Sequence, residues 1–218
     1  MSEPHVNESE TTASGDRRAW AAALMPIALH ELNNATQFLS MLHSVTSSDP
    51  NSDVLEGSAA NLARTGESVE DLGLLMAILS TAAGSDLLLE RRSERGVAVV
   101  LAAVQKLVRK NGRDLSFANQ ANEVLTSSEG KGWELPWAVG AAVWLTANNL
   151  PESESLELSF EDEAWIIRCA QGTDIKRHAT SVAEIAPLIK VTVEEGSCKL
   201  SPPSDWLRCA KRTPEQTN

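Results

Sequence analysis

The chain has 218 residues, of which 42% are hydrophobic and 22% are charged. This length suits one or two folded domains. The formal net charge of −11 argues against binding to nucleic acid or to an anionic membrane, because both require a basic surface. No apolar run reaches the roughly 20 residues that span a bilayer, and residues 1–16 lack the basic and apolar regions of a signal peptide. We therefore expect a cytoplasmic protein.

The N-terminal segment and the first helix differ sharply in composition. Residues 1–15 are polar and contain little to bury, so we expect a disordered tail. A helix is expected from Asp16, a suitable N-cap, to about Val45. Within that helix, apolar residues recur with the spacing of the a and d positions of a coiled coil: Met25, Ala28, Leu32, Ala35, Leu39 and Leu42.

A second heptad pattern follows a turn at residues 47–53. Its a positions are Leu55, Leu62, Val69, Met76 and Ala83, and its d positions are Ser58, Thr65, Leu72 and Leu79. Two long amphipathic helices joined by a short turn predict an antiparallel hairpin over residues 16–84. A second copy would bury its apolar face in a four-helix bundle, so we expect a homodimer. The alternative is a monomer whose hairpin packs on its own C-terminal half.

The string His30-Glu31-Leu32-Asn33-Asn34 lies in the middle of the first helix. In the heptad register, His30 takes the f position and points away from the apolar seam. Asn33, Asn34 and Gln37 continue the same polar face, because residues three, four and seven apart stack on a helix. An exposed histidine beside a carboxylate and two amides is accessible to chemistry. The alternative is an ordinary solvated histidine.

Residues 85–207 have an α+β pattern. The expected elements are a strand at 87–89, a helix at 97–109 ending at Asn111-Gly112, a strand at 115–118, a helix at 134–149 before Pro151, paired strands at 156–160 and 165–169 with a turn at 161–163, a helix at 182–189 leading into 190–194, and a closing strand near 198–200. Trp133, Trp137 and Trp144 are expected in the core. Residues 208–218 are expected to form a loose tail.

The three cysteines, Cys169, Cys198 and Cys209, are odd in number and widely spaced. They form no CxxC pair and no disulfide framework, which fits a reducing compartment. We expect buried structural thiols. A metal site that includes His178 is the alternative, and nothing in the spacing favours it.

The string from His30 to Asn34 resembles the H-box of bacterial sensor histidine kinases, where a helix-borne histidine takes up a phosphoryl group. The elements that follow the hairpin look like the ATP-binding module of that family, an α/β sandwich. The resemblance covers about residues 16–207. The family usually has proline directly after the string, where this chain has Ala35; the nearby proline is Pro26, one turn before the histidine.

The nucleotide-binding motifs of that family are not matched. In the family an asparagine in the middle helix holds magnesium, but Leu145 is near the expected place, and Asn148 and Asn149 lie closer to the helix end. The aspartate-glycine box that binds adenine would fall at residues 170–174, where no aspartate precedes Gly172. Residues 175–189 contain no glycine for a phosphate-binding lid. The resemblance therefore implies a degenerate ATPase-like domain that does not use ATP.

This combination is similar to the kinase-like dimeric histidine phosphotransferases of phosphorelays. The resemblance implies that His30 attacks the aspartyl-phosphate of a response-regulator receiver domain, whose own magnesium ion neutralises the moving charge. Glu31 would accept or orient the imidazole proton, and Asn34 would hold the ring, the phosphoryl oxygen or a water. No cofactor or metal of its own is expected. Two alternatives are a non-catalytic dimeric interaction module and a divergent sensor histidine kinase.

Overall fold

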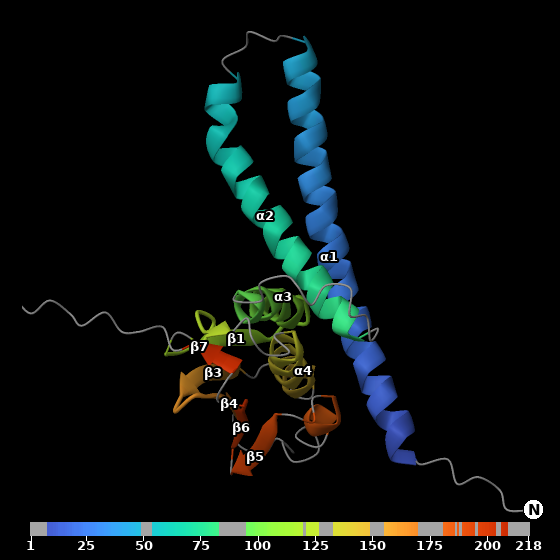
Figure 1. The fold of residues 1–218 in the computed structure, drawn as a ribbon, viewed down its shortest axis with the longest axis vertical. Helices are drawn as coiled ribbons and strands as arrows, with labels where there is room; N and C mark the ends of the chain where they lie inside the picture. The colour runs from blue at the N-terminus through green and yellow to red at the C-terminus, as the bar shows by residue number, and fades with distance from the viewer. Residues whose placement is uncertain are drawn as a thin grey trace, which may run out of the picture.

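The computed structural model describes residues 8–48, 54–82, 95–119, 121–126, 133–148, 155–169, 181–185, 187, 189–194, 196–203 and 206–208. Two long helices, α1 (Glu8–Ser48) and α2 (Val54–Ala82), form a hairpin that projects from a smaller body (Figure 1). The body contains α3 (Gly96–Lys110), α4 (Glu134–Asn148) and a β-sheet. The fold is therefore α+β with an N-terminal helical hairpin, as the sequence predicts.

The main sheet has five strands in the order β1-β3-β4-β6-β5. These strands are β1 (Asp114–Phe117), β3 (Ser155–Glu161), β4 (Ala164–Cys169), β6 (Ser197–Ser201) and β5 (Lys190–Glu194). Strand β1 pairs parallel with β3, and the other neighbours pair antiparallel. Two short strands, β2 (Leu125–Thr126) and β7 (Leu207–Arg208), form a separate antiparallel pair.

The buried face of the sheet follows the alternation of each strand, since successive side chains point to opposite faces. Leu156 and Leu158 of β3, Ile167 of β4 and Leu200 of β6 are at most 1% exposed. They belong to one core cluster with the buried residues of α3 and α4. The predicted turn between β3 and β4 is confirmed, and Asp162 adopts φ 49° there.

Several predicted boundaries need correction. Helix α1 begins at Glu8, so residues 8–15 are helical rather than disordered, and Asp16 lies inside the helix instead of capping it. Of the helix expected at 182–189, residues 181–185 are helical and residue 187 lies in a turn, while residues 186 and 188 lie outside the described residues.

The short strands β2 and β7 were not predicted, and residues 190–194, which form β5, were given no element type. Arg208, expected in a loose tail, pairs with Leu125 in the contact between β2 and β7. Strands of two residues are too short to show a hydrophobic period. The predicted strand at 87–89 and the domain boundary near residue 84 lie outside the described residues.

The heptad pattern of α1 divides into two rows. Ala28 and Ala35 are buried within the chain, with 2% and 6% exposure. The other row remains open, and Met25, Leu32 and Leu39 are 40–49% exposed. A single hairpin therefore uses only part of the predicted seam.

The same division occurs on α2. At the d positions, Leu79 is buried and Leu72 is half-buried. At the a positions, Val69 and Met76 are 46% and 43% exposed. Close to the body, each helix thus buries one heptad position inside the chain and leaves the other at the surface, whereas further out Leu62, at an a position, is half-buried.

The base of the hairpin is anchored in the core of the body by Trp20, which is fully buried. Its ring centroid lies 6.0 Å from that of Trp137 and 5.4 Å from that of Trp144, both in α4. A Cβ at Gly140 would lie 2.8 Å from Trp20 and 2.6 Å from Val100. The absence of a side chain at residue 140 therefore allows α1 and α4 to approach. Of the tryptophans expected in the core, Trp133 and Trp137 are buried and Trp144 is half-buried.

The core that contains Trp20 is continuous. One cluster joins Leu24, Ala28 and Ile78 of the hairpin with the sheet and with α3 and α4. Among the described residues, no helix is both long and apolar enough to cross a membrane.

Candidate functional site

His30 lies on α1, and its side chain is exposed, as the heptad register predicts. Asn34, one turn further along, places its Nδ2 atom 3.2 Å from Nε2 of His30. With the Asn34 amide as donor, Nε2 is the acceptor, and a neutral imidazole in this contact carries its proton on Nδ1. A neutral imidazole with a lone pair on Nε2 can act as a nucleophile. The Asn34 amide could then donate to an oxygen of a group attached to Nε2.

Glu31 is adjacent to His30 in sequence, but its carboxylate is bound to a residue of another helix. Its carboxylate accepts a hydrogen bond from Lys106 Nζ of α3 at 2.5 Å. Consecutive residues project about 100° apart around a helix, so Glu31 faces α3 while His30 faces solvent. The structure therefore brings Asn34, but not Glu31, to the imidazole ring.

Lys106 was not predicted as a site residue. It is exposed near the C-terminal end of α3 and lies 75 positions from Glu31 in sequence. The sequence pattern around Lys106 indicates only that this residue lies on the polar face of its helix. A contact with a helix distant in sequence leaves no local signal from which it could be predicted. Only the tertiary structure places it beside the histidine string.

A cavity of about 140 Å³ lies where α1, α2 and α3 meet. Its polar lining consists of Glu31, Ser68, Asp71 and Lys106, and the rest of the lining is aliphatic. The cavity therefore places a carboxylate of each hairpin helix next to the lysine of α3.

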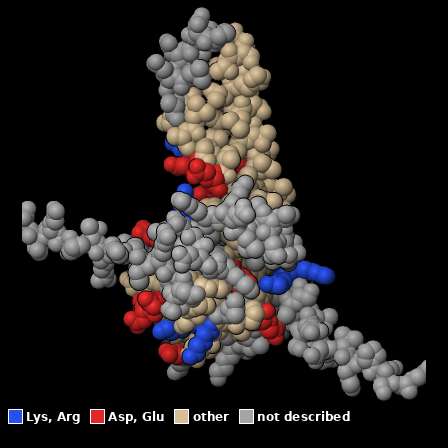
Figure 2. Space-filling model, in the orientation of Figure 1, with Lys and Arg blue, Asp and Glu red and all other residues tan. Residues whose placement is uncertain are grey.

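Asp71 forms the second ionic contact between the hairpin and the body. Its Oδ1 atom lies 3.1 Å from Nη2 of Arg95, the residue before α3, but makes no hydrogen bond there. Burial raises the pKa of the Asp71 carboxyl above its ordinary value; the Arg95 charge lowers it, Glu70 and Glu67 raise it, and Lys106 lowers it. Arg95 therefore compensates only partly for the burial of Asp71. Acidic side chains also gather on the hairpin close to the body (Figure 2).

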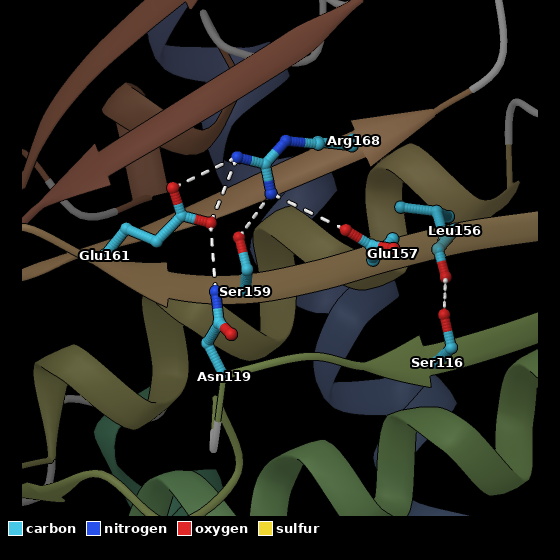
Figure 3. A network of polar contacts seen from close by, with 7 residues as sticks. All are labelled: Ser116, Asn119, Leu156, Glu157, Ser159, Glu161 and Arg168. Atoms are coloured by element: carbon cyan, nitrogen blue, oxygen red, sulfur yellow. Dashed lines mark hydrogen bonds and ion pairs between the residues drawn. The ribbon is translucent and has the colours of Figure 1, made fainter.

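A separate polar network lies on the sheet (Figure 3). Arg168 of β4 donates hydrogen bonds to Ser159 at 2.5 Å and to both carboxylate oxygens of Glu161 at 3.1 and 3.2 Å. Asn119 also donates to Glu161 at 3.3 Å. Hydrogen bonds from Ser159 and Arg168 lower the pKa of Glu161. The network links neighbouring strands, and its charged groups are mutually paired, so we assign it a structural role.

Some of the positions that would bind nucleotide in a histidine kinase lie among the described residues, and their side chains are poorly suited to nucleotide binding. Leu145 is 9% exposed in α4 and has no oxygen in its side chain to offer a metal ion. Asn148 ends α4, and its Oδ1 accepts from Asn111 at 3.5 Å. Asn149 and residues 170–174 lie outside the described residues.

The described cysteines are consistent with structural thiols. Cys198 is buried, and burial raises its pKa to about 11, so it is protonated at neutral pH. Cys169 is half-buried, whereas Cys209 and His178 lie outside the described ranges. Within those ranges, no group of three or more His, Cys, Asp and Glu side chains is arranged to hold a metal ion.

No protein-family model matches this sequence. A search of curated proteins finds no significant match. Among solved structures, the chain is similar to the cytoplasmic segment of histidine kinase QseC, with 14% sequence identity over 64% of this chain and 92% of that chain, and a TM-score of 0.37. A similarity of this size establishes neither a shared fold nor a shared function.

Proposed function

We propose that this protein is a histidine phosphotransferase of two-component signalling, which moves a phosphoryl group between receiver-domain aspartates through His30. The observation that carries the proposal is the exposed His30 ring on α1, with the Asn34 amide 3.2 Å from Nε2. An exposed site is necessary because the donor is a carboxyl phosphate held on another protein.

In the proposed transfer, the Nε2 lone pair of His30 attacks phosphorus. The N–P bond forms while the P–O bond to the receiver aspartate breaks, and the carboxylate leaves. Asn34 turns its amide from Nε2 to a phosphoryl oxygen. A magnesium ion held by the receiver would neutralise the charge that develops, and we propose no cofactor for the phosphotransferase itself. The reverse reaction delivers the group to a second receiver.

A divergent kinase is the less well supported alternative, because Leu145 is buried where a magnesium-binding asparagine is required. To separate the possibilities, the full chain is incubated with radiolabelled ATP alone, and separately with receiver domains labelled in advance by acetyl phosphate. Label on His30 only from a receiver supports the phosphotransferase. Label from ATP alone indicates a kinase, and no label from either source indicates a non-catalytic module.

Magnesium-ATP is expected to leave the melting temperature unchanged. A ligand that binds only the native state at one hundred times its Kd adds about 2.7 kcal/mol to the free energy of unfolding. For a chain of this length, each kcal/mol raises the melting temperature by about 2–4 °C, so binding would be visible in a thermal scan. A reproducible rise of several degrees at millimolar magnesium-ATP would restore the kinase interpretation.

We also propose that the protein is a homodimer through the hairpin. The open heptad rows on both helices support this proposal, and Leu29 on α1 is a further exposed apolar residue, with 57% exposure. Residues 32–48 contain no Asp, Glu, Lys or Arg, and the atoms of the upper hairpin that are not grey in Figure 2 are almost all uncharged on the face shown. A long exposed helix without charge is typical of one that packs against a partner.

Leu32→Asp and Val69→Asp are expected to convert the dimer into a monomer, because each places an unpaired charge in the proposed interface at a cost of several kcal/mol. Both side chains are about half exposed in one chain, so the monomer should keep its helical circular dichroism. Leu79→Asp is unsuitable as a test of the dimer interface, since Leu79 is buried within the single chain. Gln37→Asp, an exposed position outside the apolar rows, is the matched control. A wild-type chain that sediments as a monomer at micromolar concentration would contradict the dimer.

A further inference from the structure

We propose that Lys106 is a positioning residue for the His30 site: it holds the Glu31 carboxylate on α3, away from the imidazole, and releases it by moving to Asp71. The effect on phosphotransfer rests on the proposed function of His30. The exchange of partners rests on the geometry and charges around Lys106 and is independent of that function.

The first support is the present partner of Glu31. Lys106 Nζ lies 2.5 Å from Glu31 Oε1, and no hydrogen bond joins Glu31 to His30 in the described part of the chain. Neighbouring residues on a helix do not face each other, so a contact between Glu31 and His30 needs a rotation of the glutamate side chain. The lysine prevents that rotation for as long as it binds the carboxylate.

The second support is an alternative partner for Lys106. Asp71 lines the same cavity as Glu31 and Lys106, and its Oδ1 atom accepts no hydrogen bond. The lysine charge already acts favourably on the ionised Asp71 carboxyl, together with that of Arg95, while Glu67 and Glu70 act against it. Lys106 can therefore leave Glu31 without losing an ionic partner.

The third support is the space available. The cavity of about 140 Å³ lies between the three helices, so the ammonium group can move without displacing packed side chains. The Lys106 and Glu31 side chains are 56% and 25% exposed, and ion pairs that solvent reaches are weak. An exchange of partners is therefore energetically accessible. Once released, Glu31 can accept the Nδ1 proton of His30 and increase the nucleophilicity of Nε2.

The test compares Lys106→Met in the wild-type background and in the Glu31→Gln background. The imidazole proton and nitrogen signals of His30, identified by their loss in His30→Gln, are followed by NMR. Lys106→Met is expected to move the Nδ1 proton downfield, because the freed carboxylate accepts it. The same substitution should leave these signals unchanged in the Glu31→Gln background. Lys106→Arg, which keeps the ion pair, should resemble the wild type.

The proposal is overturned if Lys106→Met leaves the His30 imidazole signals unchanged. It is also overturned if the shift is the same in the Glu31→Gln background, since a simple loss of the lysine charge would act without the Glu31 carboxylate. The rate of label uptake from a receiver is a separate readout. It should rise by about threefold or more in Lys106→Met, with an upper limit at the roughly 10²–10⁴-fold that a fully positioned base contributes. If no receiver labels His30 but the NMR result is as expected, the proposed function fails while the exchange of Glu31 stands. Label uptake without the NMR effect supports the function and removes the role of Lys106.

Asp71→Asn tests the alternative partner of the lysine. Without a carboxylate at residue 71, Lys106 should stay on Glu31, and label uptake should fall below that of the wild type. Glu70→Gln is the matched control, because it removes an adjacent charge from α2 at a residue that does not line the cavity. An equal fall in both variants would contradict a specific role for Asp71.

Discussion

His30→Gln is expected to abolish label uptake from a phosphorylated receiver while leaving the fold and the dimer intact. The substitution removes the only proposed nucleophile, so no residual transfer is expected. The side chain is exposed on α1, and substitutions at such positions usually change stability by less than about 0.5 kcal/mol. The change in melting temperature should therefore be no more than about 2 °C.

The matched control is His43→Gln, since His43 is a second exposed histidine on the same helix. This variant should take up label at the wild-type level. Persistent labelling of His30→Gln would place the acceptor elsewhere. Loss of cooperative unfolding in His30→Gln would show that the histidine has a structural role.

Trp20→Ala is expected to lower the free energy of unfolding by about 3–5 kcal/mol, because it removes a fully buried indole from the contact with α4. Urea unfolding monitored by circular dichroism measures this difference. A loss below about 1 kcal/mol would contradict the anchoring role of this side chain.

Two glycine substitutions test the same contact from the other side. Gly140→Ala places a methyl group against Trp20 and Val100 and should cost about 1–3 kcal/mol. Gly66→Ala is the control, because nothing lies within 4 Å of its added Cβ and alanine is the better helix former. That variant should be more stable than the wild type by up to about 1 kcal/mol.

The elements with a strong local period were predictable from the sequence. Helices α3 and α4 and strands β1, β3, β4 and β6 lie within one or two residues of their expected bounds. Gly112, in the left-handed conformation at φ 72°, follows the end of α3 where the Asn111-Gly112 pair predicts it. Such signals are local, so tertiary packing does not change them.

The missing features depend on contacts between distant segments. A heptad repeat specifies that two helix positions are apolar, but it does not say which of them a neighbouring helix of the same chain covers. The contact of Lys106 with Glu31 and the docking of Trp20 on α4 arise only when the two parts of the chain meet. Gly140 carried a usable signal, because an isolated glycine inside an apolar helix indicates close packing.

The anchoring of α1 at one end gives a single helix two different local stabilities. Backbone amides near Trp20, Leu24 and Ala28 are locked in the main core and should exchange with solvent only on global unfolding. Beyond about Leu39, side chains of the single chain are exposed or only partly buried, so in the monomeric Leu32→Asp variant the amides there should exchange by fraying of the hairpin. His30 lies just after the last residue of α1 in the core cluster and precedes the fraying segment. Slower amide exchange toward Ser48 would therefore report the arrival of a partner on the hairpin, without any label on the partner itself.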